Sequence, residues 1–227
     1  MNYIIRESGE FGQDSNSYER IQREKDYISY LTNHISNVKA AYQKYFVPLL
    51  TKDFNCNKSL FTKEQLRKAI EIAKNDVDHH DESKWTEIEF EPYRMHWNPT
   101  EEEKQRDQRY QDEVENAYMN AWKHHYENNN HHPKFWYDFE NNVARDMSLE
   151  AIIHMLCDWI SFNLDSPSGT VEWWIKEAPE ERRFISPKTV NILEDILFNI
   201  LFPEDYKKFK PVTSPNINAI LKNSENK

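Results

Sequence analysis

Glycine is scarce in this chain of 227 residues, which contains only Gly9, Gly12 and Gly169. An average protein contains about 7% glycine, and glycine supplies the positive φ angles on which tight hairpin turns and phosphate-binding loops depend. The sequence also lacks the GxGxxG and GxxxxGK(S/T) patterns. The composition therefore favours helices over sheets and excludes the dinucleotide-binding and P-loop classes of nucleotide site.

Cysteine, long apolar runs and positive charge are also in short supply. Cys56 and Cys157 cannot build a dense disulfide framework, and with no CxxC pair they do not suggest a zinc ribbon, so we expect reduced thiols. No stretch approaches the ~20 apolar residues of a membrane-spanning helix, and the N-terminus has no signal-peptide run. We expect a cytoplasmic protein with no membrane partner. A net charge of −10 argues against nucleic acid as a partner.

Hydrophobic periodicity predicts a series of amphipathic helices. Thr62 and Thr100 each precede a Gln or Glu by three residues, which is the capping-box pattern of a helix start. The predicted helices are residues 18–49, a stretch that opens at Thr62 with an apolar stripe of Leu66, Ala69, Ile70, Ala73 and Val77, a charged stretch from Thr100 to His125, residues 148–163 and residues 187–201.

These elements predict an all-α fold, a single-domain helical bundle that covers residues 18–202. Residues 1–17 are polar and contain two of the three glycines, which predicts a flexible lead-in. From Pro203 onward the chain is polar and rich in Lys, Asn, Ser and Pro, so we expect residues 203–227 to form a loosely packed tail. We find no internal repeat and no clear linker.

Histidine is the most informative residue type. Nine histidines are present, and imidazoles together with carboxylates suit Fe, Mn, Ni, Co or Zn better than Mg or Ca alone. Asp81 and Asp158 fall at predicted inward positions, where a carboxylate needs a compensating cation or donor. The pattern predicts a site for one or two divalent transition-metal ions. The histidines at helix ends or on predicted core-facing stripes are His34, His79, His80, His124, His125, His131, His132 and His154.

Each of these residues also has an ordinary structural interpretation. His34 can be a hydrogen-bonded core residue, residues 79–81 a solvated helix end, and Asp158 a capping or salt-bridged side chain. The pairs 124–125 and 131–132 can form a polar helix terminus, where the dipole favours imidazolium. The joint pattern favours a metal site because four separate helices each bring a ligand-type residue to an apolar face.

The same residues resemble the HD-domain metal-dependent phosphohydrolases. That all-helical superfamily has a histidine on an early helix, a His-Asp doublet at the end of a second helix, and an aspartate on a later helix. His34, the doublet His80–Asp81 and Asp158 match these positions. Ser83 and Lys84 stand where the HDxGK pattern has its small residue and lysine. The resemblance implies an HD-domain-like fold.

The chain is also similar to a poorly characterised family of bacterial and phage proteins. The similarity rests on HDxSK, on an EFxPYR-like segment at residues 89–94 and on the His-rich segment HHYENNNHHP at residues 124–133, and it covers about residues 25–165. Two-metal HD branches often carry an HHE, a glycine-rich turn and a proline in this region. Here the glycines are absent and the histidines are doubled, so the choice of ligand among the four stays open.

The HD resemblance implies a role for each candidate residue. Asp81 and Lys84 would be catalytic, because Asp81 could bridge two ions and Lys84 could neutralise phosphate charge. The implied metal ligands are His34, His80, Asp81 and Asp158 for a first ion, with His125 and His132 for a second. The implied substrate contacts are Lys84, Arg94, His124 and His131.

The implied reaction is hydrolysis of a phosphomonoester or phosphodiester, with a small phosphorylated substrate as partner. Tryptophan and tyrosine side chains at residues 85, 93, 97, 136 and 137 make a nucleotide one option. Two alternatives stay open. The mixed-valent di-iron oxygenases resemble HD hydrolases but bind iron through four histidines and two aspartates and activate O₂. The other is a non-enzymatic helical interaction protein with a structural His/Asp site.

Overall fold

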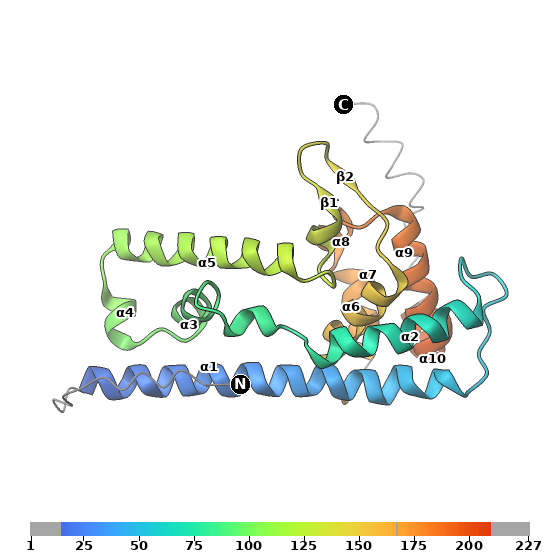
Figure 1. The fold of residues 1–227 in the computed structure, drawn as a ribbon, viewed down its shortest axis with the longest axis horizontal. Helices are drawn as coiled ribbons and strands as arrows, with labels where there is room; N and C mark the ends of the chain where they lie inside the picture. The colour runs from blue at the N-terminus through green and yellow to red at the C-terminus, as the bar shows by residue number, and fades with distance from the viewer. Residues whose placement is uncertain (1–14, 167, 210–227) are drawn as a thin grey trace. The chain divides into compact units, whose positions relative to one another are not determined.

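Helices dominate the computed structural model, which describes residues 15–166 and 168–209 (Figure 1). In these ranges the strands are β1 (Tyr137–Asp138) and β2 (Val143–Ala144), a short antiparallel pair in which Tyr137 faces Ala144. The predicted all-α fold is confirmed. Within the same ranges no helix combines the length and apolar character needed to cross a membrane.

The chain divides into two compact units, and each contains two separate stretches of sequence. Unit 1 comprises Met1–Asn33 and Asp81–Asn128, and unit 2 comprises His34–His80 and Asn129–Lys227. The changes from one unit to the other fall inside helix α1, between His80 and Asp81, and at the end of helix α5. None of these positions has the composition of a linker, which explains why the sequence shows no boundary there.

Helix α1 (Ser15–Ala41) begins inside the predicted lead-in and contributes to both units. Its buried side chains include Tyr27, Leu31 and Val38, at the three- and four-residue spacing of a helix stripe. Ile28 fits this stripe by its three-residue spacing from Leu31, but it is exposed; Tyr27 is buried instead and packs edge-on against Phe90. The helix continues as the π-helix η1 (Tyr42–Phe46) and the 3₁₀-helix η2 (Val47–Leu50).

The core of unit 2 is built where helix α2 (Lys63–Asp78) packs against helix α6 (Leu149–Ser161) (Figure 1). Thr62 and Gln65 form the predicted capping box at the start of α2, and all five residues of the predicted stripe are buried. Ser148 caps α6 through the Ala151 N–H. Helix α6 is buried along nearly its whole length, so its few polar side chains lie inside unit 2.

Short helices make up much of the rest of unit 2. The predicted helix at residues 187–201 is confirmed, and it consists of α9 followed by η5. The predicted tail is wrong for its first seven residues, which form α10; residues 1–14 and 210–227 lie outside the described residues. Cys56 and Cys157 are free. The elements are η4 (Pro133–Trp136), α7 (Ser168–Lys176), α8 (Pro179–Arg182), α9 (Pro187–Glu194), η5 (Asp195–Leu201) and α10 (Pro203–Phe209).

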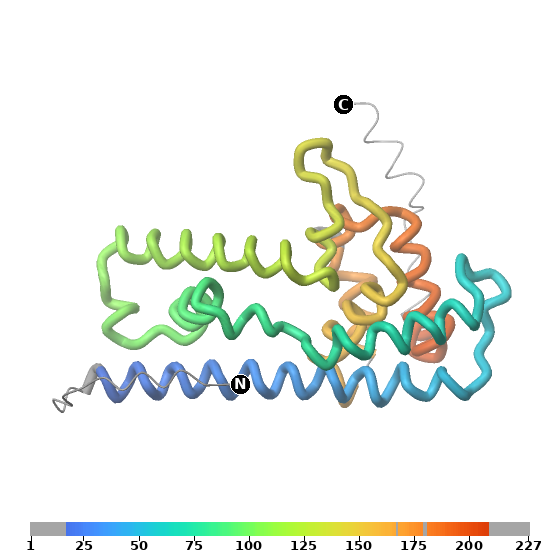
Figure 2. Tube along the Cα trace, in the orientation of Figure 1, coloured from blue at the N-terminus to red at the C-terminus, as the bar shows by residue number. Residues whose placement is uncertain are grey.

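Unit 1 contains a helix that the sequence did not predict and a break that it did not predict. The unpredicted helix is α3 (Phe90–Trp97), in which Pro92 occupies the first turn, where a backbone N–H is not needed. The predicted helix from Thr100 to His125 is split at Arg106, whose backbone is extended. Figure 2 shows α3 beside α5. The elements are η3 (Glu82–Trp85), α3, α4 (Glu101–Gln105) and α5 (Gln108–Asn128).

A buried arginine holds α3 and α4 together. Arg94 is fully buried, and its guanidinium donates to Glu103 through two hydrogen bonds of 2.6 and 2.7 Å and to Glu91 at 2.7 Å. Glu103 also accepts from the Thr100 N–H in the predicted capping box. A guanidinium engaged in this way stabilises unit 1; the substrate contact that the HD resemblance implies for Arg94 stays a prediction.

We predict that Glu103→Gln destabilises the protein, because the variant keeps the shape of the side chain and removes the charge that faces Arg94. The free energy of unfolding should fall by about 2 kcal/mol, as expected for a hydrogen bond to a charged group. Urea denaturation measures this change. Glu102→Gln is the matched control, since Glu102 is 55% exposed and its Arg106 partner lies at 3.9 Å; it should change stability by less than about 0.5 kcal/mol.

The free energy of unfolding of Glu103→Gln should also depend on pH less steeply than that of the wild type in acid. Burial raises the pKa of Glu103, but its hydrogen bonds with Arg94 and Thr100 outweigh burial and hold that pKa below its usual 4.5. A carboxyl with a lowered folded-state pKa stabilises the fold above its unfolded pKa, and the contribution is lost as the pH falls through the folded pKa. Below about pH 4.5, wild type should therefore lose stability more steeply than Glu103→Gln; equal slopes would contradict the assignment.

Candidate metal centre

Four histidines and one aspartate gather inside unit 2. The first histidine lies on helix α1, the second in the turn that follows α2 and the third in the loop before η4, while the fourth histidine and the aspartate lie on α6. All five are buried, with at most 8% of the residue exposed. They are His34, His80, His131, His154 and Asp158.

Three of these side chains direct one atom each toward a common point. His34 Nε2 lies 3.1 Å from His80 Nε2 and 3.1 Å from Asp158 Oδ1, and His80 Nε2 lies 3.7 Å from the same oxygen. Ligand atoms about 2.1 Å from one ion are about 3.0 Å apart at right angles and about 3.4 Å apart at tetrahedral angles. The triangle of two imidazole nitrogens and one carboxylate oxygen therefore fits a single divalent ion.

The other ring nitrogen of His80 belongs to a second group of imidazoles. His80 Nδ1 lies 2.9 Å from His154 Nε2, and the ring of His131 lies against both, with centroids 4.7 Å from His80 and 4.2 Å from His154. His80, His131 and His154 each offer a nitrogen within 4.8 Å of the other two. His80 is thus shared by the two groups.

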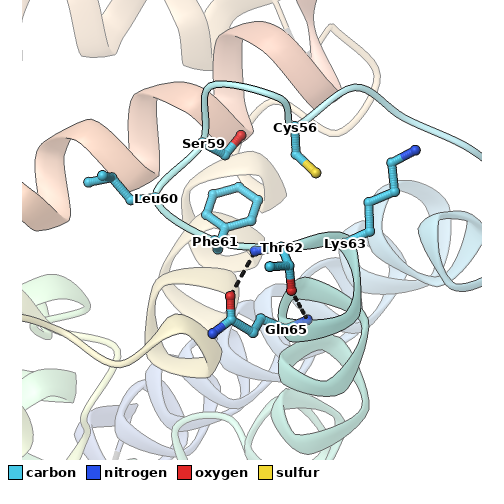
Figure 3. Close-up of a pocket in the computed structure, with 7 residues that line it drawn as sticks. All are labelled: Cys56, Ser59, Leu60, Phe61, Thr62, Lys63 and Gln65. Atoms are coloured by element: carbon cyan, nitrogen blue, oxygen red, sulfur yellow. Dashed lines mark hydrogen bonds between the residues drawn. The ribbon is translucent and has the colours of Figure 1, made fainter.

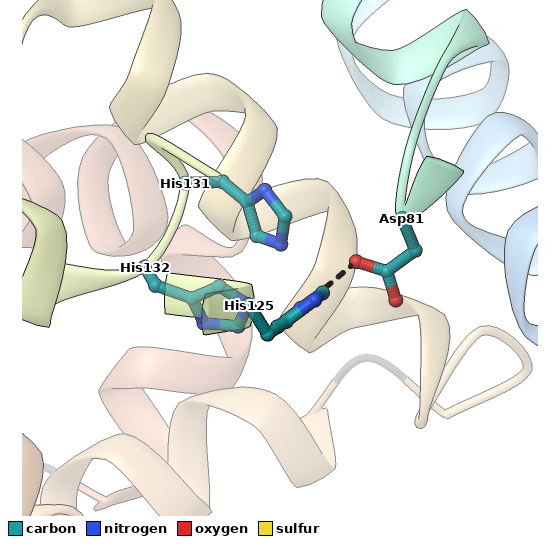
Figure 4. Close-up of side chains that lie close together, drawn as sticks. All are labelled: Asp81, His125, His131 and His132. Atoms are coloured by element: carbon teal, nitrogen blue, oxygen red, sulfur yellow. Dashed lines mark ion pairs between the residues drawn. The ribbon is translucent and has the colours of Figure 1, made fainter. Parts of the chain in front are cut away.

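His154 had no assigned role in the sequence-based prediction, although a usable signal was present. His154 and Asp158 are four residues apart on α6, and this spacing puts both side chains on one helix face. His131 was predicted to contact substrate and His132 to bind metal. Within unit 2, His131 lies against the rings of His80 and His154. His132 lies near His131, with a centroid separation of 4.2 Å; Figure 4 shows His131 and His132.

A separate group of charged and imidazole side chains lies in unit 1. Asp81 Oδ1 is 3.2 Å from His125 Nε2 (Figure 4), and Asp81 Oδ2 accepts from Lys84 Nζ at 2.6 Å. Asp81 is buried and has a φ of 58°, a left-handed conformation that is strained for a residue other than glycine. Lys84 is mostly buried and also lies over the Tyr93 ring. Lys84 is therefore not a solvated surface residue.

Glu89 is the residue of unit 1 that sequence reasoning missed, although it stands in the EFxPYR-like segment. Its buried carboxylate accepts from His124 Nδ1 at 2.7 Å, from His125 Nδ1 at 2.8 Å and from Ser83 Oγ at 3.1 Å. Burial raises the pKa of Glu89, but the hydrogen bonds from His125 and His124 outweigh it and lower that pKa. Burial lowers the pKa of His125, and its contacts with Asp81 and Glu89 raise it above 6.5.

The predicted site residues are divided between the two units. The structure brings together His34, His80 and Asp158 in one unit, and Asp81, Lys84 and His125 in the other. His124 is joined to His125 through Glu89. Unit 2 holds His34, His80, His131, His132 and Asp158, and unit 1 holds Asp81, Lys84, Arg94, His124 and His125.

A surface hollow of about 510 Å³ also lies in unit 2, in the loop before α2 and the first turn of that helix (Figure 3). Residues on its wall include Cys56, Phe61 and Lys63. Among the residues that the structure describes, those that line this hollow include none of the candidate metal ligands. It therefore has no part in the candidate centre.

The chain matches a known family model over most of its length. A model described as a family of unknown function, DUF5662, matches residues 23–199, a range that includes every candidate residue of both units. No curated protein and no solved structure matches the chain. The chemistry of the centre must therefore be argued from its own residues.

We predict that Glu89→Gln lowers the pKa of His125 in protein freed of metal ions by a chelator. The substitution removes the negative charge of one of the two carboxylates that raise this pKa. NMR titration of the imidazole resonances measures the change. Glu82→Gln, at an exposed position of η3, is the control and should leave the titration unchanged. An unaltered His125 titration in Glu89→Gln would contradict the prediction.

Proposed function

We propose that this chain, which belongs to the DUF5662 family of unknown function, is a metal-dependent phosphohydrolase. The observation that carries the proposal is the buried triangle of His34 Nε2, His80 Nε2 and Asp158 Oδ1, with sides of 3.1, 3.1 and 3.7 Å. Two imidazoles and a carboxylate suit Mn, Fe, Co, Ni or Zn. These three residues would hold the ion.

The net charge of the proposed metal centre favours a phosphorylated substrate. A divalent ion supplies Lewis-acid chemistry, since it polarises a phosphoryl oxygen and lowers the pKa of water. His34 and His80 bind an ion as neutral imidazoles, so Asp158 offsets one of the two positive charges. The remaining positive charge favours an anionic group such as phosphate over a neutral one.

Unit 1, taken by itself, holds the ion pair of Lys84 with Asp81. The Lys84 ammonium, held 2.6 Å from Asp81 Oδ2, is suited to neutralise charge on a phosphate. The ligand roles that the HD resemblance implies for Asp81, His125 and His132 stay predictions, as do the substrate contacts of His124 and His131. Membership of the HD superfamily, a second ion and a nucleotide as the substrate also stay predictions.

We predict that protein purified without chelator carries a transition metal and hydrolyses phosphoesters. Elemental analysis measures the metal, and a screen of phosphomonoesters, phosphodiesters and nucleotides with Mn²⁺, Co²⁺, Ni²⁺ and Mg²⁺ measures activity. Asp158→Asn and His80→Ala should each lower metal affinity and activity by about 100-fold or more, because a direct ligand contributes more than the ~10–100-fold of an outer-shell partner.

His79→Ala is the matched control for this test. His79 is the neighbour of His80 but is exposed, and its Nδ1 lies 2.8 Å from the Asn75 carbonyl oxygen. This variant should keep its metal and its activity. A wild-type protein that binds no metal would overturn the proposal. Metal that stabilises folding without any turnover would favour the non-enzymatic structural site.

The same triangle also favours a second candidate function. Two histidines and one carboxylate on one face of an ion form the ligand set of non-haem iron oxygenases. The structure offers further imidazoles beside it, since His131 and His154 lie against His80. Together with Asp158, these four histidines supply most of the four-histidine, two-aspartate ligand set of an HD-type mixed-valent di-iron oxygenase, which is therefore the alternative to a hydrolase.

Loading metal-free protein with Fe²⁺ separates the two candidates. An oxygenase of this type should show a coupled di-iron signal in electron paramagnetic resonance and should consume O₂ when substrate is added. A hydrolase should act on phosphoesters with Mn²⁺ or Co²⁺ under argon. We predict hydrolysis without O₂; O₂ uptake with no phosphoester hydrolysis would instead establish the oxygenase.

A further inference from the structure

His80 belongs to both imidazole groups of unit 2, and its two ring nitrogens face different neighbours. Nε2 faces His34 and Asp158, while Nδ1 faces His154 Nε2 at 2.9 Å. A neutral imidazole carries one proton. If Nε2 is the nitrogen directed at an ion, the proton must lie on Nδ1, where it can be donated to His154 Nε2.

We infer that His154 is a positioning residue for His80, which fixes the ring orientation and the tautomer that leave Nε2 available to a metal ion. This inference rests on the proposed function, because it requires His80 to be a metal ligand. A ligand histidine usually donates its second N–H to a carboxylate, a backbone carbonyl or water. Here the acceptor is the imidazole of His154.

The position of His154 on α6 supports this role. His154 is buried among apolar residues of the helix, where a polar ring without a hydrogen bond would be costly. Asp158 lies one turn later on the same face. One rigid helix therefore carries both a ligand and the group that orients another ligand, so their spacing does not depend on a loop.

His131 restricts the ring of His154 further. Its ring centroid lies 4.2 Å from that of His154 and 4.7 Å from that of His80, and His131 itself is 1% exposed. The rings of His80 and His154 meet at 74°, an edge-on arrangement that suits an N–H of one ring directed at a nitrogen of the other. Rotation of His154 would lose this contact.

A neutral acceptor has a consequence for the class of substrate. A carboxylate behind His80 would increase the basicity of this ligand and add a negative charge near the centre. A neutral imidazole increases the basicity of His80 less than a carboxylate does, and it adds no negative charge. Asp158 therefore remains the source of negative charge in the group described for unit 2. The centre keeps more of its positive charge, which suits an anionic phosphate.

The test compares two polar substitutions. In His154→Gln the side-chain amide can place an oxygen near the position of Nε2, where it can accept the His80 Nδ1–H. In His154→Asn the amide is shorter and lies near the position of Nδ1. The two variants differ in their reach to His80 and are otherwise similar in polarity. Circular dichroism melts establish that both are folded.

Metal-free protein is titrated with Co²⁺, and the visible absorption band gives affinity, stoichiometry and coordination. We expect His154→Asn to weaken Co²⁺ binding by about 10–100-fold at unchanged stoichiometry, as for other outer-shell partners. His154→Gln should stay within a few-fold of wild type and keep its spectrum. Asp158→Asn, measured in parallel, tests the metal site itself.

Every other outcome overturns the inference. If Asp158→Asn weakens binding but both His154 variants behave as wild type, the metal site stands and His154 does not position His80. If both His154 variants lose an equivalent of Co²⁺, His154 is a ligand. If the wild type binds no Co²⁺, the proposed function fails and this inference fails with it.

Discussion

The cost of placing polar rings and a carboxylate inside the apolar core of unit 2 is the constraint on which the rest of the structure depends. Helix α6 is buried over nearly its whole length against α2, and yet it carries His154 and Asp158. A buried polar group without a partner costs about 1–3 kcal/mol. The contacts of these residues with His80 and His34 offset that cost, so the packing of α6 and the histidine cluster depend on each other.

Unit 1 also contains a buried carboxylate whose cost of burial is offset by hydrogen bonds from histidine side chains. Glu89 is fully buried and accepts hydrogen bonds from His124 and His125, and the other nitrogen of His125 faces Asp81. In both units, one ring nitrogen of a candidate ligand histidine thus contacts a second polar side chain, while the other ring nitrogen faces the remaining residues of the group. Such support fixes the direction of the ring nitrogen that faces a ligand, which is what a metal centre requires.

Local patterns predicted the helices where local interactions decide the structure. The capping boxes at residues 62–65 and 100–103 and the buried stripe of α2 were all found as predicted. The predictions that failed concern positions where contacts with other segments of the chain determine the structure. Ile28 fits the stripe of α1 by spacing, but Tyr27 is buried because Phe90 packs against it. The unpredicted α3 is held to α4 through the buried Arg94, a contact with Glu103 nine residues away.

The sequence by itself determined that the fold is all-α and that His154 and Asp158 share one face of a helix, because a repeat of 3.6 residues per turn is local. The resemblance to the HD-domain proteins implied His34, His80 and Asp158 among the metal ligands. Only the tertiary structure decided which faces meet. The packing of unit 2 divided the two nitrogens of His80 between His34 and His154, and the packing of unit 1 engaged Arg94 with two glutamates. Contacts between distant segments follow from the way whole helices pack, and no short pattern in the sequence encodes them.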